Sequence, residues 1–227
     1  MRMKTLLMGD IRFQFKYGFY FIYLVFTVIY ISLVHALPKD WRERGAILMI
    51  YTDPAAMGLY FMGAILLFEK SEHVLNSIAV SPVKPMEYVI SKLLSIGMIS
   101  TMAGLLIGLS GGFISNIFSF LVGIFLGSCL ISSVGLIVAA NIGSLNQFIV
   151  VSIPAELIIN VPAIVWMFRW KPVWLILHPG VCMIELFQNG DRAMIAAAIL
   201  VFWTFMLAAG AHAVIKKSLQ SMGGVKL

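Results

Sequence analysis

The sequence predicts an all-α integral membrane protein with six transmembrane helices. Hydrophobic residues make up 61% of the chain and charged residues only 11%, whereas an average soluble domain is about 25% charged. The apolar residues are gathered in runs long enough to cross the hydrocarbon core of a bilayer as helices. This composition excludes soluble folds. The spans use up most of the chain and leave no separate catalytic domain, which predicts a single transmembrane domain over residues 1–227.

The first element is expected to be a helix over residues 1–16 that lies along the membrane surface. In this stretch Met3, Leu7, Ile11 and Phe15 recur every four residues, a spacing that places them on one face of a helix. A basic helix with one apolar face is typical of the headgroup layer. The alternative is a frayed basic tail.

Six apolar runs then qualify as spans on length and lack of charge. We expect them at about residues 17–37, 46–68, 89–110, 116–140, 148–168 and 193–215. An even number of spans puts both termini on one side of the membrane. That side carries most of the lysine and arginine residues, so the positive-inside rule places both termini in the cytoplasm.

Residues 69–88, between the second and third spans, form a charged and proline-stiffened cytoplasmic loop. Apolar residues in it follow the i, i+3, i+4 spacing of a short amphipathic helix. Acidic residues precede that helix, and a Ser-Pro pair ends it. The residues are Glu69 and Glu72 around the start of the helix, Val74, Leu75 and Ile78 on its apolar face, and Ser81 and Pro82 at its end. A rigid helix of this kind is able to transmit force from a docked partner.

Residues 169–192, before the last span, are predicted to form an outer re-entrant segment. Their apolar pieces are too short to cross a bilayer. Pro172, Pro179 and Gly190 divide them into short helical fragments. Re-entrant or interfacial helices on the outer face are therefore expected.

Three polar residues inside the spans are candidates for a translocation path: Asp53, Glu156 and Asn160. Charges in hydrocarbon are costly, so they normally face a protein interior or a wet cavity. Glu156 lies between two prolines, which predicts a broken helix beside a polar pocket. Asp53 is open to a second interpretation, because it precedes Pro54 and is suited to capping a helix that starts there.

Glycines at a period of four predict close helix packing at Gly104, Gly108, Gly123 and Gly127. Contacts within one chain are favoured over contacts between two copies.

No catalytic, cofactor or metal site is expected. The stretch GLSGG at residues 108–112 matches the GxSxG motif, but a nucleophilic serine needs a base within hydrogen-bond reach. Ser110 ends the third span at the outer face, whereas His212 lies near the cytoplasmic end of the sixth. The GxxxxGK[ST] phosphate loop is absent from the sequence. The chain is therefore not expected to be an enzyme by itself, and any energy comes from another subunit.

Several stretches resemble the permeases of ABC-2 type exporters. The second span ends GAILLFEK at residues 63–70, VSPV follows at residues 80–83, and Glu87, Tyr88 and Lys92 open the third span. Members commonly have an acidic residue at the end of span two and an SP dipeptide after the helix, and both are present. The start DIRFQFKYGFYFIY, residues 10–23, looks more particularly like permeases of the fluoroquinolone export type.

The resemblance implies a type V exporter fold and a homodimer that binds two cytoplasmic ATPase subunits, which hold ATP and Mg²⁺. The helix at residues 71–80 would enter a groove of the ATPase, and Glu69 and the N-terminal helix would brace it. The resemblance further implies the prokaryotic cytoplasmic membrane, outward movement of an amphipathic drug-like or lipid-like molecule, and no nucleic-acid partner.

Two other classes of function are open. One is an ATP-independent channel or secondary carrier in which Glu156 and Asp53 bind protons or cations. Such carriers often contain two matching halves, and the sequence shows no convincing internal repeat. The other is a membrane scaffold or immunity factor that binds a partner without moving cargo.

Overall fold

The computed structural model describes residues 2–52, 56–168 and 171–222. All regular structure in these residues is helical, without a strand, which confirms the predicted fold class at that level. The elements are α1 (Arg2–Lys16), α2 (Phe19–Ala36), α3 (Lys39–Ile50), α4 (Ala56–Ser71), α5 (Val74–Ala79), α6 (Pro85–Gly111), α7 (Ile117–Ala140), α8 (Leu145–Met167), the 3₁₀ helix η2 (Val173–Leu177), α9 (Pro179–Phe187) and α10 (Ala193–Met222).

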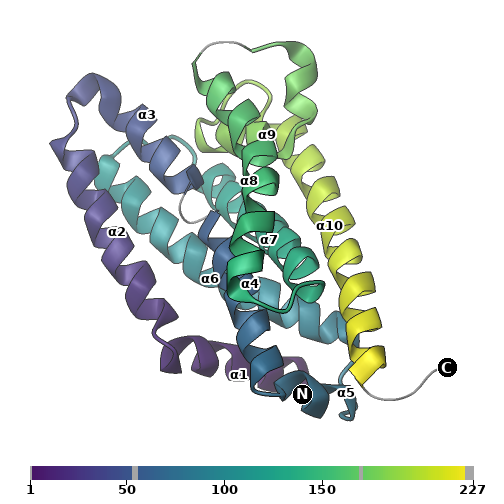
Figure 1. Cartoon of the computed structure of the whole chain (residues 1–227). Coiled ribbons are helices and arrows are strands. Elements are labelled where there is room, and N and C mark those ends of the chain that lie inside the picture. Colours follow the sequence, from purple (N-terminus) through teal and green to yellow (C-terminus); the bar gives the residue numbers. More distant parts are fainter. Residues whose placement is uncertain (1, 53–55, 169–170, 223–227) are drawn as a thin grey trace.

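The long helices form a bundle around α6 and α7 (Figure 1). Helix α1 lies across the lower end of the bundle, and α2 rises from it along one side. Helix α5 is at the same lower end, while α3, η2 and α9 lie at the upper end. The last helix, α10, runs down the opposite side and ends near α5. The first and last helices of the chain therefore end at the same side of the bundle.

Five helices of the described chain are long and apolar enough to cross a membrane: α2, α6, α7, α8 and α10. The second expected span, residues 46–68, is not one helix. Helix α3 ends at Ile50, Tyr51 and Thr52 have π-helical geometry, and α4 begins at Ala56. Pro54 falls in this interval of the sequence, and proline has no N–H for an i→i−4 hydrogen bond. The candidate Asp53 lies outside the described residues.

Local sequence signals explain several helix ends. Asn116 caps α7, since its side-chain oxygen accepts from the backbone N–H groups of Phe118 at 3.1 Å and Ser119 at 3.2 Å. Helix α6 starts with Pro85 at its first turn, where the missing N–H costs nothing. It ends at Gly111 and is followed by Gly112, whose φ of 66° is in the left-handed region that favours glycine.

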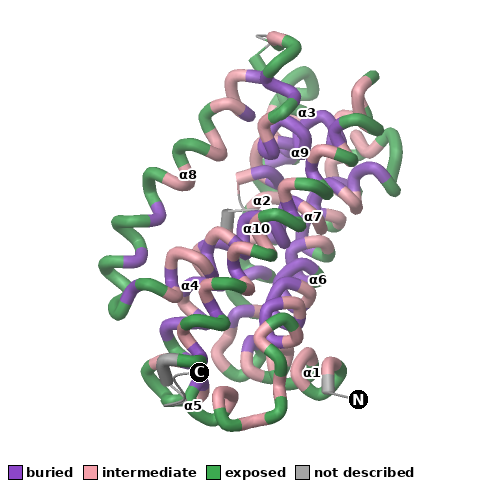
Figure 2. Tube along the Cα trace, turned by 90° about the vertical axis from the view of Figure 1, so that its right-hand side faces the viewer, coloured by how far each residue is buried: buried purple, intermediate pink, exposed green. Residues whose placement is uncertain are grey.

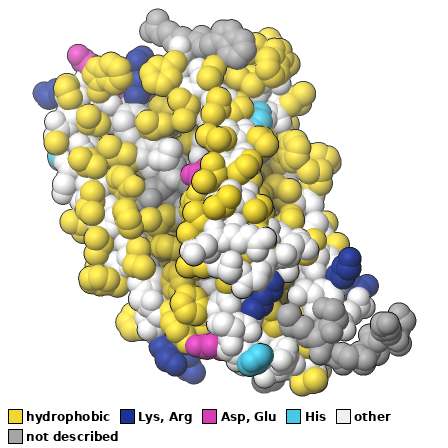
Figure 3. All heavy atoms as spheres, in the orientation of Figure 1, with side chains coloured by type: hydrophobic (Ala, Val, Ile, Leu, Met, Phe, Trp, Pro, Cys, Tyr) yellow, Lys and Arg dark blue, Asp and Glu magenta, His cyan; other side chains and the backbone are white. Residues whose placement is uncertain are grey.

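The interior of the bundle contains α7 and much of α6 (Figure 2). Helix α7 packs against α4, α6, α9 and α10. Helix α8 instead lies at the periphery and is mostly exposed or half-buried. In the space-filling view, hydrophobic side chains cover most of one face of the bundle, and Lys and Arg side chains lie near its two ends (Figure 3). Such a band is suited to lipid.

Helix α8 is continuous, although Pro154 and Pro162 lie inside it. The expected break is therefore wrong. Pro162 cannot donate to the carbonyl of Ile158, because proline has no N–H group. The Tyr51 hydroxyl donates to the next carbonyl, that of Ile159, at 2.9 Å. Tyr51, directly after α3, thus joins α3 to α8 beside Pro162.

Candidate functional site

A buried group of charges joins α1, α4 and α6 near α5. The Nζ atom of Lys92, which is 1% exposed, lies 2.5 Å from Asp10 Oδ1 and forms a second ion pair with Glu69. The Tyr88 hydroxyl donates to Glu69, and the Ser91 hydroxyl donates to Asp10. We call Asp10, Glu69 and Lys92 the ion-pair cluster. Every charge in it has a partner of opposite sign or a hydroxyl donor.

The start of α6 sets the direction of the cluster side chains. The N–H of Lys84 donates to Glu87 Oε2 at 2.9 Å, which fixes the first turn. Tyr88, Ser91 and Lys92 then follow at the i, i+3, i+4 positions of one helix face. That face is turned toward α1 and α4.

The cluster fixes α1 and the end of α4 to α6. Breaking a buried ion pair by removing one partner costs about 3–5 kcal/mol, because a buried charge is left uncompensated. Lys92 also lies over the rings of Phe13 and Tyr88, with 5.8 Å and 5.2 Å from Nζ to the ring centroids. A separate hydrogen bond of 2.8 Å from Gln14 Nε2 to Ser95 Oγ joins α1 and α6 again.

Two further contacts hold the chain on either side of the cluster. Tyr17, after α1, donates its hydroxyl to Glu72 Oε1 at 2.5 Å, and this hydrogen bond raises the pKa of Tyr17. Lys70 Nζ donates to the carbonyls of Ala139, Ala140 and Ile142 at 2.8, 2.7 and 3.0 Å. Burial lowers the pKa of Lys70 from its ordinary value. Lys70 thereby donates to carbonyl groups in the last turn of α7 and just after it, where helical N–H donors run out.

Helix α5 is shorter than expected, and its apolar face is turned inward. Leu75 is 1% exposed and belongs to the main core, while Val74 and Ile78 are half-buried. In this structure Leu75 therefore faces the core of the chain itself, and its role in coupling stays a prediction. Helix α5 packs against α4 and α10, so the chain itself covers the apolar face. The residues after α5 present Val80 instead, at 81% exposed.

The Ser-Pro pair ends α5 as predicted. The Ser81 hydroxyl donates to the Ile78 carbonyl at 2.7 Å, and the backbone N–H of Val83 donates to Ser81 Oγ at 3.4 Å. Pro82 follows and has no N–H to continue the helix. The short loop to α6 is thus held by side-chain hydrogen bonds.

The acidic site inside the membrane region lies between α8 and α4. The Tyr60 hydroxyl donates to Glu156 Oε2 at 2.5 Å, and Asn160 Nδ2 donates to Glu156 Oε1 at 3.5 Å. Glu156 and Asn160 line a cavity of about 10 Å³ together with Leu59, Ile131 and Ile159. That volume is enough for about one water molecule. The structure thus brings Glu156 and Asn160 together, but the cavity is too small for an organic substrate.

The four predicted packing glycines lie at helix contacts within the chain. A Cβ atom at Gly108 would come 2.6 Å from Phe120, and one at Gly104 would come 2.7 Å from Ile124, so this stripe of α6 faces α7. Gly123 and Gly127 face α9 instead, where they contact residues Met183 to Phe187. The two stripes therefore pack against different elements and not against each other.

Sequence reasoning missed the pairing of Asp10 with Lys92, the role of Lys70 and the contact of Tyr60 with Glu156. One signal was available, since a lysine within an apolar helix is costly unless an acidic group pairs with it. By that rule, Asp10 in the amphipathic helix and Glu69 at the end of α4 are candidate partners of Lys92. Among the described residues, no group of three His, Cys, Asp or Glu side chains is placed to hold a metal ion.

Comparison with known proteins adds a family to this geometry. The model of the fluoroquinolones export permease protein family matches residues 1–222. This chain belongs to that family. The match includes the ion-pair cluster, α5 and the Glu156 site, and it confirms the resemblance to ABC-2 type permeases. The chain is therefore a multi-pass membrane protein of a permease family.

Two curated relatives carry the same description. Both are fluoroquinolones export permease proteins of Mycobacterium tuberculosis, from strains CDC 1551 / Oshkosh and ATCC 25618 / H37Rv. Each is 24% identical to this permease over 154 residues, which cover 67% of this chain and 65% of the relative. The alignment therefore spans somewhat less than two thirds of either relative.

Proposed function

We propose that this permease is the membrane-spanning subunit of an ATP-binding-cassette exporter. It moves an amphipathic organic molecule outward, using ATP that a separate cytoplasmic subunit hydrolyses with Mg²⁺. The family match over residues 1–222 supports the class of function. The two relatives are described as exporting fluoroquinolones, which supports a drug-like cargo for this chain.

The observation that carries the proposal is the fixed attachment of the α5 segment. The ion-pair cluster joins α1, α4 and α6 directly beside it, and Lys70 joins the end of α4 to α7. A partner that displaces α5 therefore displaces several membrane helices together. This is the mechanical property that coupling to an external ATPase needs.

The surface that meets the ATPase consists of the exposed residues of α5 and of the residue that follows it. Asn76, Ser77 and Val80 are exposed, whereas Leu75 is buried in the bundle. In this arrangement α3 and α4 together make the second of six crossings, and both termini are in the cytoplasm of a prokaryotic cell. Two copies form a homodimer in the cytoplasmic membrane, and each copy binds one ATPase.

Co-purification tests the proposal. We expect the permease to recover a soluble ATPase from the native membrane, and we expect Val80→Asp to abolish that recovery while the protein still inserts and folds. The matched control is Val173→Asp in η2 at the other end of the bundle, where the valine is 67% exposed. The control is expected to leave recovery unchanged. Full recovery with Val80→Asp, Asn76→Arg and Ser77→Arg combined would exclude this docking surface.

The carrier alternative has a separate readout. Transport by the isolated permease in vesicles, under an ion gradient and without nucleotide, would support a carrier based on Glu156.

A further inference from the structure

The exposed side of α1 combines basic residues with apolar side chains. Lys4, Arg12 and Lys16 are exposed there. Met8 and Phe15 are exposed on the same side, at 52% and 75%. With 3.6 residues per turn, these five side chains lie within about 120° of the helix circumference. A helix face that is basic and apolar at once is typical of the headgroup layer of a membrane.

The acidic residue of α1 is turned away from this exposed face. Asp10 pairs with Lys92, and Gln14 Nε2 donates to Ser95 Oγ at 2.8 Å, so the opposite side of α1 is fixed to α6. None of the three exposed basic residues forms an ion pair within the described part of the chain. The exposed face therefore carries three positive charges that no carboxylate of the described chain compensates.

Helix α1 lies at the level where the apolar band of the bundle begins. Helix α2 starts at Phe19, shortly after α1 ends, and rises along the side of the bundle (Figure 1). The exposed residues of α2 between Phe21 and Ile29 are all apolar. A bilayer whose hydrocarbon surrounds this part of α2 places its headgroups beside α1.

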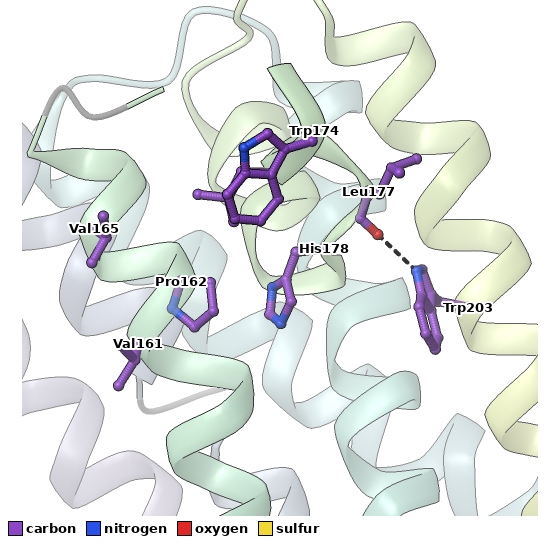
Figure 4. Close-up of a pocket in the computed structure, with 8 residues that line it drawn as sticks. Val161, Pro162, Val165, Trp174, Leu177, His178 and Trp203 are labelled. Carbon is purple, nitrogen blue, oxygen red and sulfur yellow. Dashed lines mark hydrogen bonds between the residues drawn. The ribbon is translucent and has the colours of Figure 1, made fainter. Parts of the chain in front are cut away.

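The groove between α8, η2 and α10, at the other end of the bundle, provides a contrast (Figure 4). Trp203 Nε1 donates to the Leu177 carbonyl at 2.9 Å there. No lysine or arginine is among the described residues that line this groove. An apolar lining does not distinguish one headgroup from another, whereas a basic segment at the membrane surface attracts anionic lipids. The exposed face of α1 is therefore able to select a lipid by its charge.

We propose that the exposed face of α1 binds the headgroups of anionic phospholipids. The lysine and arginine side chains donate charge-assisted hydrogen bonds to phosphate oxygens, while Met8 and Phe15 enter the boundary between headgroups and acyl chains. Because the opposite side of α1 holds Asp10 against Lys92, a lipid that fixes α1 also supports the ion-pair cluster. Binding needs neither ATP nor the ATPase, so this inference goes beyond the proposed function and does not depend on it.

Lipid titration of the purified, delipidated permease in detergent tests the proposal. Phosphatidylglycerol and phosphatidylcholine with the same acyl chains are the matched probes, since only the first carries a net negative charge. At low ionic strength we expect phosphatidylglycerol to bind about tenfold more tightly, which corresponds to about 1.4 kcal/mol. Native mass spectrometry measures the bound lipid. Added salt is expected to reduce the preference, because it screens exposed charges.

Two triple variants with a matched control locate the preference on α1. Glutamine at all three positions is expected to reduce the preference to about twofold or less: Lys4→Gln, Arg12→Gln and Lys16→Gln. Exchange of one basic residue for the other keeps the charge and is expected to keep the preference: Lys4→Arg, Arg12→Lys and Lys16→Arg. The control removes three exposed charges at the other end of the bundle and is expected to keep the preference as well: Lys39→Gln, Arg44→Gln and Lys171→Gln.

Equal affinity of the unchanged permease for the two lipids would overturn the proposal, as would an unchanged preference in the glutamine variant of α1. An equal loss of preference in the control would show that overall charge, and not α1, selects the lipid. Loss of ATPase recovery in the glutamine variant, with the lipid preference intact, would assign this face to a protein partner. A preference that depends on α1 in a permease that recovers no ATPase would support this inference and remove only the exporter.

Discussion

Helices α7 and α8 are 24 and 23 residues long and are both strongly apolar, yet they occupy opposite positions in the bundle. In the most apolar 18 residues of each, 61% are buried in α7 and 17% in α8. Hydrophobicity therefore does not separate an interior helix from a peripheral one in this protein. The reason is physical, because lipid tails are as apolar as leucine and do not drive apolar helices together.

Small and weakly polar residues mark the interior helix. Gly123, Gly127 and Gly135 lie in α7 at contacts with other elements, and Ser128, Ser132 and Ser133 are fully buried there. Helix α8 contains no glycine between Leu145 and Met167. The interior helix thus differs from the peripheral one in two ways. Its glycines allow other backbones to come close, and its serines are buried in protein, since lipid offers them no hydrogen-bond partners.

The largest expected effect comes from removing the buried positive charge of Lys92. Lys92→Met leaves Asp10 and Glu69 without their cation, and we expect the free energy of unfolding in detergent to fall by about 3–5 kcal/mol. The measurement is denaturant unfolding followed by circular dichroism. Lys84→Met, at an exposed position before α6, serves as the control and is expected to have little effect.

A second variant shows whether charge is responsible. Lys92→Met combined with Asp10→Asn and Glu69→Gln removes all three charges, and most of the lost stability is expected to return. If this triple variant is as unstable as Lys92→Met, packing and not ion pairing explains the cluster.

A smaller effect is expected from filling a glycine contact of α7. A Cβ atom at Gly135 would lie 2.6 Å from the Leu59 carbonyl oxygen of α4, which is backbone and cannot rotate away. We expect Gly135→Leu to reduce stability by about 1–3 kcal/mol. The control is Val150→Leu in α8, where the side chain is 66% exposed. Equal thermal stability of the two variants would remove the distinction between interior and peripheral helices.

The smallest effect concerns the contact that joins α8 to α4. Tyr60→Phe removes the hydrogen bond to Glu156, and we expect about 1 kcal/mol less protection of α8 amides in hydrogen exchange. Tyr20→Phe is the comparison, because no hydrogen bond from the Tyr20 hydroxyl is seen among the described residues. If the amides of α8 exchange faster in Tyr60→Phe but not in Tyr20→Phe, the result supports a peripheral helix that is held by few polar contacts.

Sequence reasoning predicts features of this protein that depend on local signals. Pro85 and Glu87 predict the start of α6, and Ser81-Pro82 predicts the end of α5. Long apolar runs predict the five long helices. These signals work because they act within one turn of helix or depend on the bilayer thickness alone.

Features that depend on distant neighbours could not be predicted. The spacing of Val74, Leu75 and Ile78 reveals an apolar face, but it does not reveal that α4 and α10 cover this face. The prolines of α8 indicate a region that is short of helical hydrogen bonds, but they do not reveal that Tyr51, distant in the sequence, donates to the Ile159 carbonyl there. The partner of a buried group is a property of the three-dimensional packing, so composition alone does not identify it.

The contact between Lys70 and the end of α7 has a consequence for how this protein changes shape. The carbonyl oxygens of Ala139, Ala140 and Ile142 accept from one ammonium group in the last turn of α4, directly before the loop that contains α5. While these hydrogen bonds hold, α7 cannot slide along its axis without displacing that loop. A conformational cycle that shifts the central helix lengthwise must either carry the loop with it or release this lysine, and the second route exposes it to water.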